Sequence, residues 1–144
     1  MNITHLPLPP TALRVEQSTS QEINTRIELD TALNVERIAD QGPAAIELRL
    51  AELDREWDIE RTLEANAAAL TLASLVLGFS VDRRWFALPV VVTAFLLQHA
   101  LQGWCPPLPL FRRLGIRTAR EIYLERTALC ILRGDFSPTT VDRV

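Results

Sequence analysis

Four side chains of this 144-residue chain are suited to nucleophilic, redox or metal chemistry, namely Cys105, Cys130, His5 and His99. A thiol becomes reactive when a cation, a base or a helix N-terminus lowers its pKa. Cys105 follows a long apolar segment that should be helical, and the dipole at a helix C-terminus opposes a thiolate. Cys105 is therefore a weak catalytic candidate, and the alternative is a small residue that fills a proline-rich turn. Cys130, inside an expected helix, is assigned to packing.

The spacing of these residues predicts neither a metal site nor a cofactor. Neither histidine belongs to a ligand motif such as HExxH, and two cysteines make neither a metal-binding pattern nor a disulfide framework. The fifteen basic residues are all arginines. They flank apolar segments, and no motif of interleaved aromatic and basic residues accompanies them, so we expect no nucleic-acid partner.

Two segments without permanent charge occupy the middle of the chain. They cover residues 65–81 and 85–104, and three polar residues separate them. A bilayer core ~30 Å thick is crossed by about 20 helical residues, with ~17 as the lower limit. The core helix of a soluble protein normally keeps a polar face, which these segments lack. The sequence therefore predicts a two-span transmembrane helical hairpin over residues 65–104, with the lipid bilayer as a partner.

Tryptophans stand where the hairpin should meet the membrane interface. Trp85 and Trp104 bracket the second segment, and Trp57 precedes the first, as interfacial tryptophans do. Three polar residues lie in the last turns of the second segment: Gln98, His99 and Gln102. An ionisable group inside a membrane is a functional candidate. The alternative is that His99 lies close enough to the headgroups to be hydrated.

Small residues recur at helical spacing in both segments. The first segment carries Ala67, Thr71, Ser74 and Gly78, and the second carries Ala87, Val91, Ala94 and Gln98. Small side chains let two helices approach closely, and close packing drives helix association in lipid. We expect these stripes to pack within the hairpin or against another chain. A second copy or another membrane protein is therefore an expected partner.

The sequence before the hairpin is predicted to contain one well-formed helix. Residues 1–43 are polar and rich in proline at their start, and we expect a largely flexible tail with at most one short helix. Residues 44–64 are expected to form a single amphipathic helix. Four apolar residues recur there at spacings of four, three and four: Ile46, Leu50, Leu53 and Trp57.

The sequence after the hairpin is expected to lie at the interface and then to form one more helix. Residues 105–117 are predicted to be a proline-rich interfacial turn, with Arg112 and Arg113 at the headgroups. Thr118 and Glu121 have the capping-box spacing, which predicts a helix over 118–133 and a tail over 134–144. The expected apolar face of this helix is Leu124, Ala128 and Ile131.

The distribution of arginines predicts the orientation of the hairpin. Seven arginines lie near the span ends on the side of the termini: Arg49, Arg55, Arg61, Arg112, Arg113, Arg117 and Arg120. Only Arg83 and Arg84 lie on the other side. Because positive residues are retained in the cytoplasm, we expect a multi-pass protein of a bacterial-type inner (plasma) membrane with both termini cytoplasmic. The expected fold is an all-α membrane protein, its hairpin preceded by an amphipathic helix and followed by a cytoplasmic or interfacial helix.

The order of motifs over about residues 58–120 resembles the YgaP-like transmembrane domain family (domain of unknown function 2892). Seven residues carry the resemblance: Gly103, Cys105 and Pro106 in one motif, and Leu114, Gly115, Ile116 and Thr118 in the next. The resemblance implies a membrane hairpin and, because some members are fused to a rhodanese domain, a link with sulfur species. Ala119 stands where a second cysteine often follows, which removes the near partner for a dithiol.

Three hypotheses about function follow. The first is a small inner-membrane protein, without an assigned enzyme activity, that oligomerises or binds another membrane protein. The second is a thiol-dependent sulfur carrier or transferase that uses Cys105. The third is a soluble helical protein with a buried hairpin.

Overall fold

The structure is a computed structural model that describes residues 9–136, and it contains helices and turns but no strand within that range. Residues 1–8, with His5, and residues 137–144 of the expected C-terminal tail lie outside the described part. The elements follow in this order: α1 (Arg14–Gln17), α2 (Gln21–Asp40), α3 (Pro43–Leu53), α4 (Ile59–Ser80), the 3-10 helix η2 (Arg83–Phe86), α5 (Ala87–Gln102), α6 (Leu108–Arg113) and α7 (Ala119–Arg133). An all-helical chain with two long apolar helices is confirmed for the described residues.

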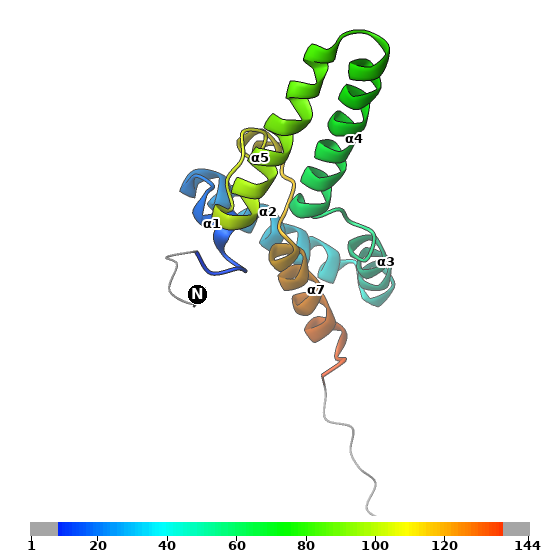
Figure 1. The fold of residues 1–144 in the computed structure, drawn as a ribbon. Coiled ribbons are helices and arrows are strands. Elements are labelled where there is room, and N and C mark those ends of the chain that lie inside the picture. Colours follow the sequence, from blue (N-terminus) through cyan, green and yellow to red (C-terminus); the bar gives the residue numbers. More distant parts are fainter. Residues whose placement is uncertain (1–8, 137–144) are drawn as a thin grey trace, which may run out of the picture.

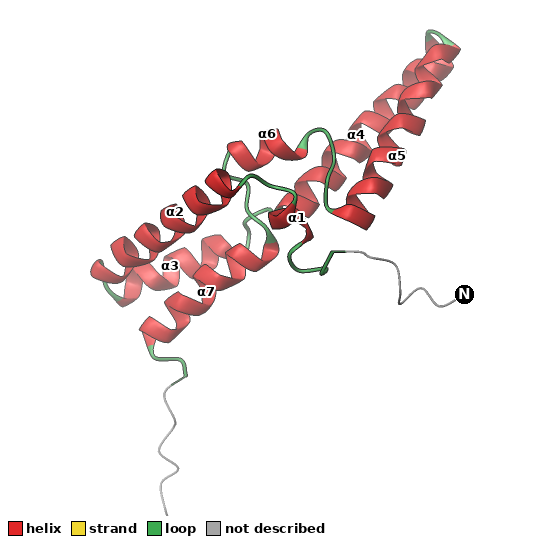
Figure 2. Cartoon of the chain, turned by 90° about the vertical axis from the view of Figure 1, so that its left-hand side faces the viewer, coloured by secondary structure: helices red, strands yellow, loops and turns green. Residues whose placement is uncertain are grey.

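The helices form two regions. Figure 1 shows α4 and α5 as an antiparallel hairpin that projects away from α2, α3 and α7, and Figure 2 shows the same separation from the side. The three helices α2, α3 and α7 pack together, and we call them the bundle. Their shared core consists of Ile38, Ile46, Leu50, Leu53 and Leu129. The short helices α1 and α6 lie where the two regions meet (Figure 2).

The hairpin is closed by a tight connection at its far end. The carboxylate of Asp82 accepts a hydrogen bond from the backbone N–H of Arg84 at 2.8 Å and so caps η2, which leads directly into α5. The rings of Phe79 and Phe86 meet edge to face with centroids 5.0 Å apart. A Cβ placed on Gly78 would lie 2.7 Å from the Phe86 ring, so this close approach requires glycine.

Residues 21–40 form a helix of twenty residues, so the expectation of a largely flexible tail over 1–43 is wrong for this part. The inward face of α2 is a stripe at spacings of three and four: Asn24, Ile27, Thr31, Asn34 and Ile38. Only two of these five are apolar. The stripe is held by hydrogen bonds to arginine and glutamate side chains as well as by burial. A polar inward face produces no hydrophobic periodicity, which is why the pattern failed to predict this helix.

The single helix expected over 44–64 is two helices. α3 ends at Leu53, and α4 begins at Ile59 after a linker over residues 54–58. Asp58 starts α4 by accepting a hydrogen bond from the Arg61 N–H at 2.8 Å. The N–H of Ile59 donates to the carbonyl of Arg117 at 2.8 Å, which fixes the new helix direction. Trp57 therefore lies in the linker, about half exposed, with the Arg61 guanidinium 4.4 Å from its ring centroid.

The region after α5 contains more helix than expected. Gly103 ends α5 in the left-handed conformation, and α6 follows within the predicted turn over 105–117, with Leu108 fully buried. α7 begins at the predicted capping box of Thr118 and Glu121. Its predicted apolar face is wrong, since Leu124 and Ile131 are exposed. The inward residues of α7 are Glu121, Glu125 and Leu129, because the face toward α2 and α3 carries carboxylates paired with arginines.

Candidate functional site

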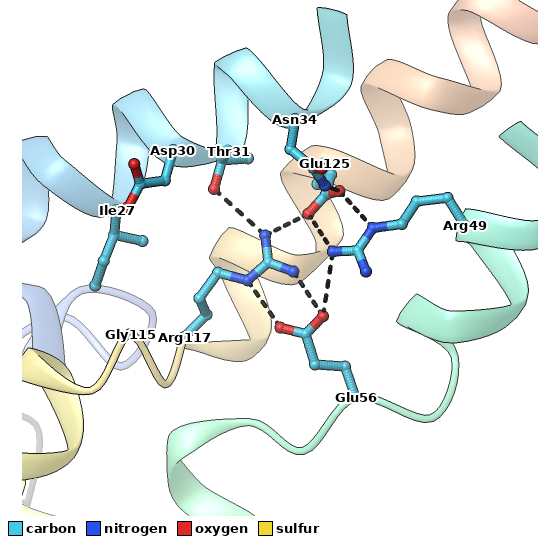
Figure 3. A pocket seen from close by; sticks show the side chains of 9 residues that line it. All are labelled: Ile27, Asp30, Thr31, Asn34, Arg49, Glu56, Gly115, Arg117 and Glu125. Atoms are coloured by element: carbon cyan, nitrogen blue, oxygen red, sulfur yellow. Dashed lines mark hydrogen bonds and ion pairs between the residues drawn. The ribbon is translucent and has the colours of Figure 1, made fainter. Parts of the chain in front are cut away.

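The bundle encloses a cluster of charged side chains from four segments of the chain. Arg49 comes from α3, Glu56 from the linker before α4, Arg117 from the turn before α7 and Glu125 from α7 (Figure 3). Arg117 donates to both oxygens of Glu56, at 2.8 and 2.7 Å, and also to Glu125. Arg49 donates to both oxygens of Glu125, at 2.9 and 3.2 Å. Asn34 of α2 donates to the same carboxylate at 2.6 Å, so one cluster joins all three helices of the bundle.

The charges of this cluster stabilise one another. Burial alone would raise the pKa of Glu125, but hydrogen bonds from Arg49 and Arg117 outweigh it and hold the pKa below its ordinary value. Burial lowers the pKa of Arg117, but the hydrogen bonds to Glu56 and Glu125 raise it above the ordinary value. The cluster lines a pocket of about 360 Å³. The two carboxylates neutralise the two guanidinium groups, so the pocket holds no surplus positive charge for an anionic ligand. The cluster therefore serves to connect the helices of the bundle.

A second buried ion pair corrects the placement of Arg112. We expected Arg112 and Arg113 at the lipid headgroups, but Arg112 is 0% exposed. Its guanidinium donates to both oxygens of Glu121 at 2.7 Å, and it also donates to the side-chain oxygen of Asn24 at 3.1 Å. This pairing ties α6 to α2 and α7. Arg113 is exposed, as expected for a surface residue.

A third polar cluster lies where the hairpin meets the bundle. The Nε2 atom of His99, near the end of α5, lies 2.8 Å from Oε2 of Glu60 in the first turn of α4. The other oxygen of Glu60 accepts a hydrogen bond from Arg14 of α1 at 2.6 Å. Cys105 is buried in the adjoining apolar cluster, with Val15, Ile59, Leu63 and Leu108. A carboxylate and an imidazole therefore pair across the base of the hairpin, next to the apolar cluster that contains Cys105.

This third cluster decides between the alternatives for His99. The side chain is buried, with only 2% of the residue exposed, so the alternative of a hydrated histidine at the headgroups is wrong. The reason is the carboxylate of Glu60, which provides a polar partner inside the protein. Of its predicted neighbours, Gln98 is half-buried and Gln102 is exposed. Among residues 9–136 no group of three His, Cys, Asp or Glu side chains could hold a metal ion.

Of the two predicted small-residue stripes, the one on α4 faces into the hairpin and the one on α5 faces mostly outward. Ser74 and Gly78 of α4 are buried, and Ala67 and Thr71 are half-buried, so this stripe lies on the inward side of the hairpin. The stripe predicted for the second segment is on the wrong face, because three of its members are exposed: Ala87, Val91 and Ala94. The more buried face of α5 passes through Val92, Leu96 and His99. Trp57, Trp85 and Trp104 are each partly exposed, between 38 and 49%.

Sequence reasoning found Cys105 and His99 but missed Glu60 and Arg14. Glu60 precedes His99 by 39 positions and Arg14 precedes Glu60 by 46. No local spacing relates residues so far apart. The available signal was Glu60 itself, a carboxylate at the start of a helix that becomes apolar further on, which in a membrane setting calls for a nearby partner.

Comparison with known proteins adds no relative from which a role could be transferred. No protein-family model matches the sequence, and neither the curated proteins nor the solved structures give a match. The function must therefore be argued from the geometry of this chain.

Proposed function

We propose that this chain is an integral membrane protein whose α4–α5 hairpin crosses the bilayer and holds the bundle at one face. The exposure of the hairpin carries this proposal. Large apolar side chains cover its outside, among them Leu72, Val76, Phe79, Val90 and Leu97. In the most apolar stretch of η2 and α5 only 6% of the residues are buried. A contiguous apolar surface of this kind is typical of a membrane or partner contact, and it argues against a soluble protein with a buried hairpin.

The dimensions of the hairpin match a bilayer. The 22 residues of α4 and the 16 residues of α5 rise ~33 Å and ~24 Å at 1.5 Å per residue, and η2 lengthens the second helix, against a core of ~30 Å. Arg83 and Arg84 at the far end have the polar side chains needed outside the hydrocarbon. Most other arginines lie on the side of the bundle. This asymmetry favours a cytoplasmic bundle, with both termini on that side of a bacterial-type inner membrane.

The exposed face of α5 supports a partner-binding role within the membrane. The stripe of α4 is already used inside the hairpin, whereas Ala87, Val91 and Ala94 remain exposed. Small exposed residues allow another helix to approach closely. The hairpin therefore acts as an anchor that associates with a second copy or with another membrane protein. The resemblance to the YgaP-like transmembrane domain, centred on Gly103, Cys105 and Pro106, is consistent with this role.

A matched pair of substitutions tests the membrane proposal. Leu72 on α4 and Leu48 on α3 are similarly exposed, at 65% and 67%. If α4 spans the bilayer, Leu72→Arg places a charge in hydrocarbon at about 2.5–3.5 kcal/mol and should reduce the fraction that stays in membranes after a carbonate wash. Leu48→Arg should leave that fraction unchanged. A wild-type protein that leaves the membranes in the wash would overturn the proposal.

A second candidate function is a thiol-dependent sulfur carrier or transferase at the membrane. The observation that favours it is a buried thiol, Cys105, in the cluster that also contains Ile59, next to the paired side chains of Glu60 and His99. A carrier should take up a sulfur atom from a low-molecular-weight persulfide, which mass spectrometry detects on Cys105. Absence of that adduct, in protein whose Cys105 thiol is reactive, would exclude the carrier and leave the membrane anchor untouched.

A further inference from the structure

We propose that the outward side of α6, together with Arg26 of α2, binds the phosphate of anionic lipid headgroups. We call this set the α6 surface, and it consists of Leu110, Arg113, Leu114 and Arg26. The inference rests on the proposed membrane anchor, because the hairpin has to bring α6 to the bilayer. It goes further by naming the class of lipid and the two guanidinium groups that recognise it.

The inward side of α6 is fixed at the end of the hairpin that adjoins the bundle. Leu108 is fully buried in a cluster with Ile59 and Leu63, which belong to the start of α4. Arg112, one turn further along α6, is held by its two hydrogen bonds to Glu121. Figure 2 shows α6 beside this end of α4. Because α4 enters the bilayer there in the proposed topology, α6 lies at the level of the headgroups.

The outward side of α6 is apolar. Leu110 is 58% exposed, and Leu114, which follows the last residue of the helix, is 69% exposed. A spacing of four residues places both side chains on the same side. Two leucines presented by a fixed helix beside an arginine are typical of an interfacial segment, whose apolar side enters the boundary between headgroups and acyl chains.

Two guanidinium groups accompany these leucines. Nη2 of Arg26 donates to the backbone carbonyl of Arg113 at 2.7 Å, and both arginines are exposed. Neither belongs to the arginines that form ion pairs with Asp or Glu within residues 9–136, which are Arg14, Arg49, Arg112, Arg117, Arg120, Arg126 and Arg133. Guanidinium groups that no protein carboxylate neutralises are complementary to a phosphate, which accepts several of their N–H groups at once.

The distribution of acidic residues favours α6 over the other approach to the hairpin. Residues 83–120 contain no Asp or Glu, whereas residues 54–64 contain five acidic residues and two arginines. On α2, Glu22 and Asp30 lie one turn before and one turn after Arg26, and neither forms an ion pair with it in the described structure. The surplus of positive charge at the base of the hairpin is therefore on the side of α6, where it attracts anionic headgroups.

The binding test uses the full chain in a nonionic detergent. Anionic phosphatidylglycerol and zwitterionic phosphatidylcholine with identical acyl chains are added separately, and the melting temperature is measured. A lipid that binds only the folded protein raises this temperature. Phosphatidylglycerol should give half of its full effect at a mole fraction about tenfold or more below that of phosphatidylcholine, because each arginine contributes about fivefold at an anionic surface.

Paired substitutions locate the preference on the molecule. Arg26→Gln combined with Arg113→Gln should lower the preference for phosphatidylglycerol about tenfold. The control combines Arg37→Gln with Arg133→Gln, which removes the same charge from the last turns of α2 and α7, at the ends that point away from the hairpin (Figure 2). This control should keep the preference. Melting without lipid shows that each variant is folded.

Two further measurements separate charge from folding. Replacing Arg26 and Arg113 by lysine keeps the charge and should retain most of the preference. High salt should reduce the preference of the unaltered chain, since it screens exposed charges. The proposal is overturned if the unaltered chain responds equally to the two lipids, if salt has no effect, or if the glutamine pair and its control behave alike.

Inorganic phosphate tests the alternative source of the anion. If phosphate without lipid stabilises the chain as fully as phosphatidylglycerol does, and the glutamine pair abolishes the effect, the arginines bind a soluble anion and the lipid proposal is wrong. The carbonate wash keeps this result apart from the membrane anchor. The glutamine pair should stay in the membranes like the unaltered chain, because its hairpin is unchanged, so a lost lipid preference concerns the α6 surface alone.

Discussion

In the α4–α5 hairpin the large apolar side chains point outward and the small ones point inward, whereas the bundle of α2, α3 and α7 places charged side chains inside. Ser74 and Gly78 are buried in the hairpin while Phe79 is 83% exposed. In the bundle, Glu125 is 1% exposed and lies between two arginines. The hairpin is therefore held by close packing, and the bundle by an apolar core together with ion pairs that depend on having every partner present.

This difference is the one expected if the hairpin lies in lipid and the bundle in water, as proposed. Apolar side chains gain little from leaving lipid, so small residues that permit close contact are the useful inward choice in a hairpin surrounded by lipid. In water, an apolar core and buried pairs of opposite charge can both hold helices together. The contrast leads to four predictions, ordered by the size of the expected effect.

Removing one partner from the charged cluster should have the largest effect. Glu125→Ala leaves the buried Arg117 and the partly buried Arg49 without their shared carboxylate, and should destabilise the bundle by about 3–5 kcal/mol. Denaturant unfolding followed by circular dichroism measures this change. Glu47→Ala on the exposed side of α3 is the control and should change stability little. Similar stabilities for the two variants would show that the cluster does not hold the bundle.

Acid should weaken the bundle. The pKa values of Glu121 and Glu125 lie below the ordinary value of 4.5, because hydrogen bonds from arginines outweigh the effect of burial. A carboxyl group with a lowered folded-state pKa contributes its full stability above the unfolded pKa and loses it as the pH falls through the folded pKa. Thermal unfolding should therefore shift to lower temperature below about pH 4.5. Glu125→Gln should reduce that shift, and an unchanged pH profile would contradict this account.

Crowding the hairpin should have an intermediate effect. Gly78→Leu forces a side chain against Phe86 and should destabilise the hairpin by about 1–3 kcal/mol, without lowering its hydrophobicity. Leu70→Ile on the exposed face is the control. Thermal stability in detergent compares the two variants. Equal melting temperatures would mean that α4 and α5 do not pack through this stripe.

The smallest predicted effect concerns the helix caps of the bundle. Thr118 caps α7 through its side chain, whereas Ser20 at the start of α2 makes no such hydrogen bond. Thr118→Ala should therefore cost about 1 kcal/mol and Ser20→Ala almost nothing. Chemical unfolding of the two variants gives the comparison. A larger loss from Ser20→Ala would reverse the assignment of the caps.

The hairpin could be predicted from the sequence and the bundle only in part. Long runs without charge and the tryptophans predicted where α4 and α5 lie, because each signal is local. The capping box of Thr118 did the same for α7. By contrast, α2 was missed because its inward residues include Asn24, Thr31 and Asn34. The inward face of α7 was misassigned because glutamates such as Glu121 and Glu125 are usually exposed and were therefore expected at the surface.

The candidate site could also be predicted only where the signal was local. Cys105 and His99 stood out as rare residues near the end of an apolar run. Their surroundings depended on Glu60 and Arg14, which the fold brings together from distant segments. Arg112 was placed at the headgroups because arginine is usually exposed, and only a bidentate partner such as Glu121 can reverse that expectation.

The order of the bundle helices along the chain has a consequence for biosynthesis. α2 and α3 leave the ribosome before the hairpin, and α7 leaves after it. Until α7 emerges, Arg49 and Glu56 lack Arg117 and Glu125, and the apolar residues of α2 and α3 lack Leu129. The bundle can therefore close only after the hairpin has been translated. In the proposed membrane topology, a complete bundle therefore requires that the hairpin has brought its two ends back to the same side of the bilayer.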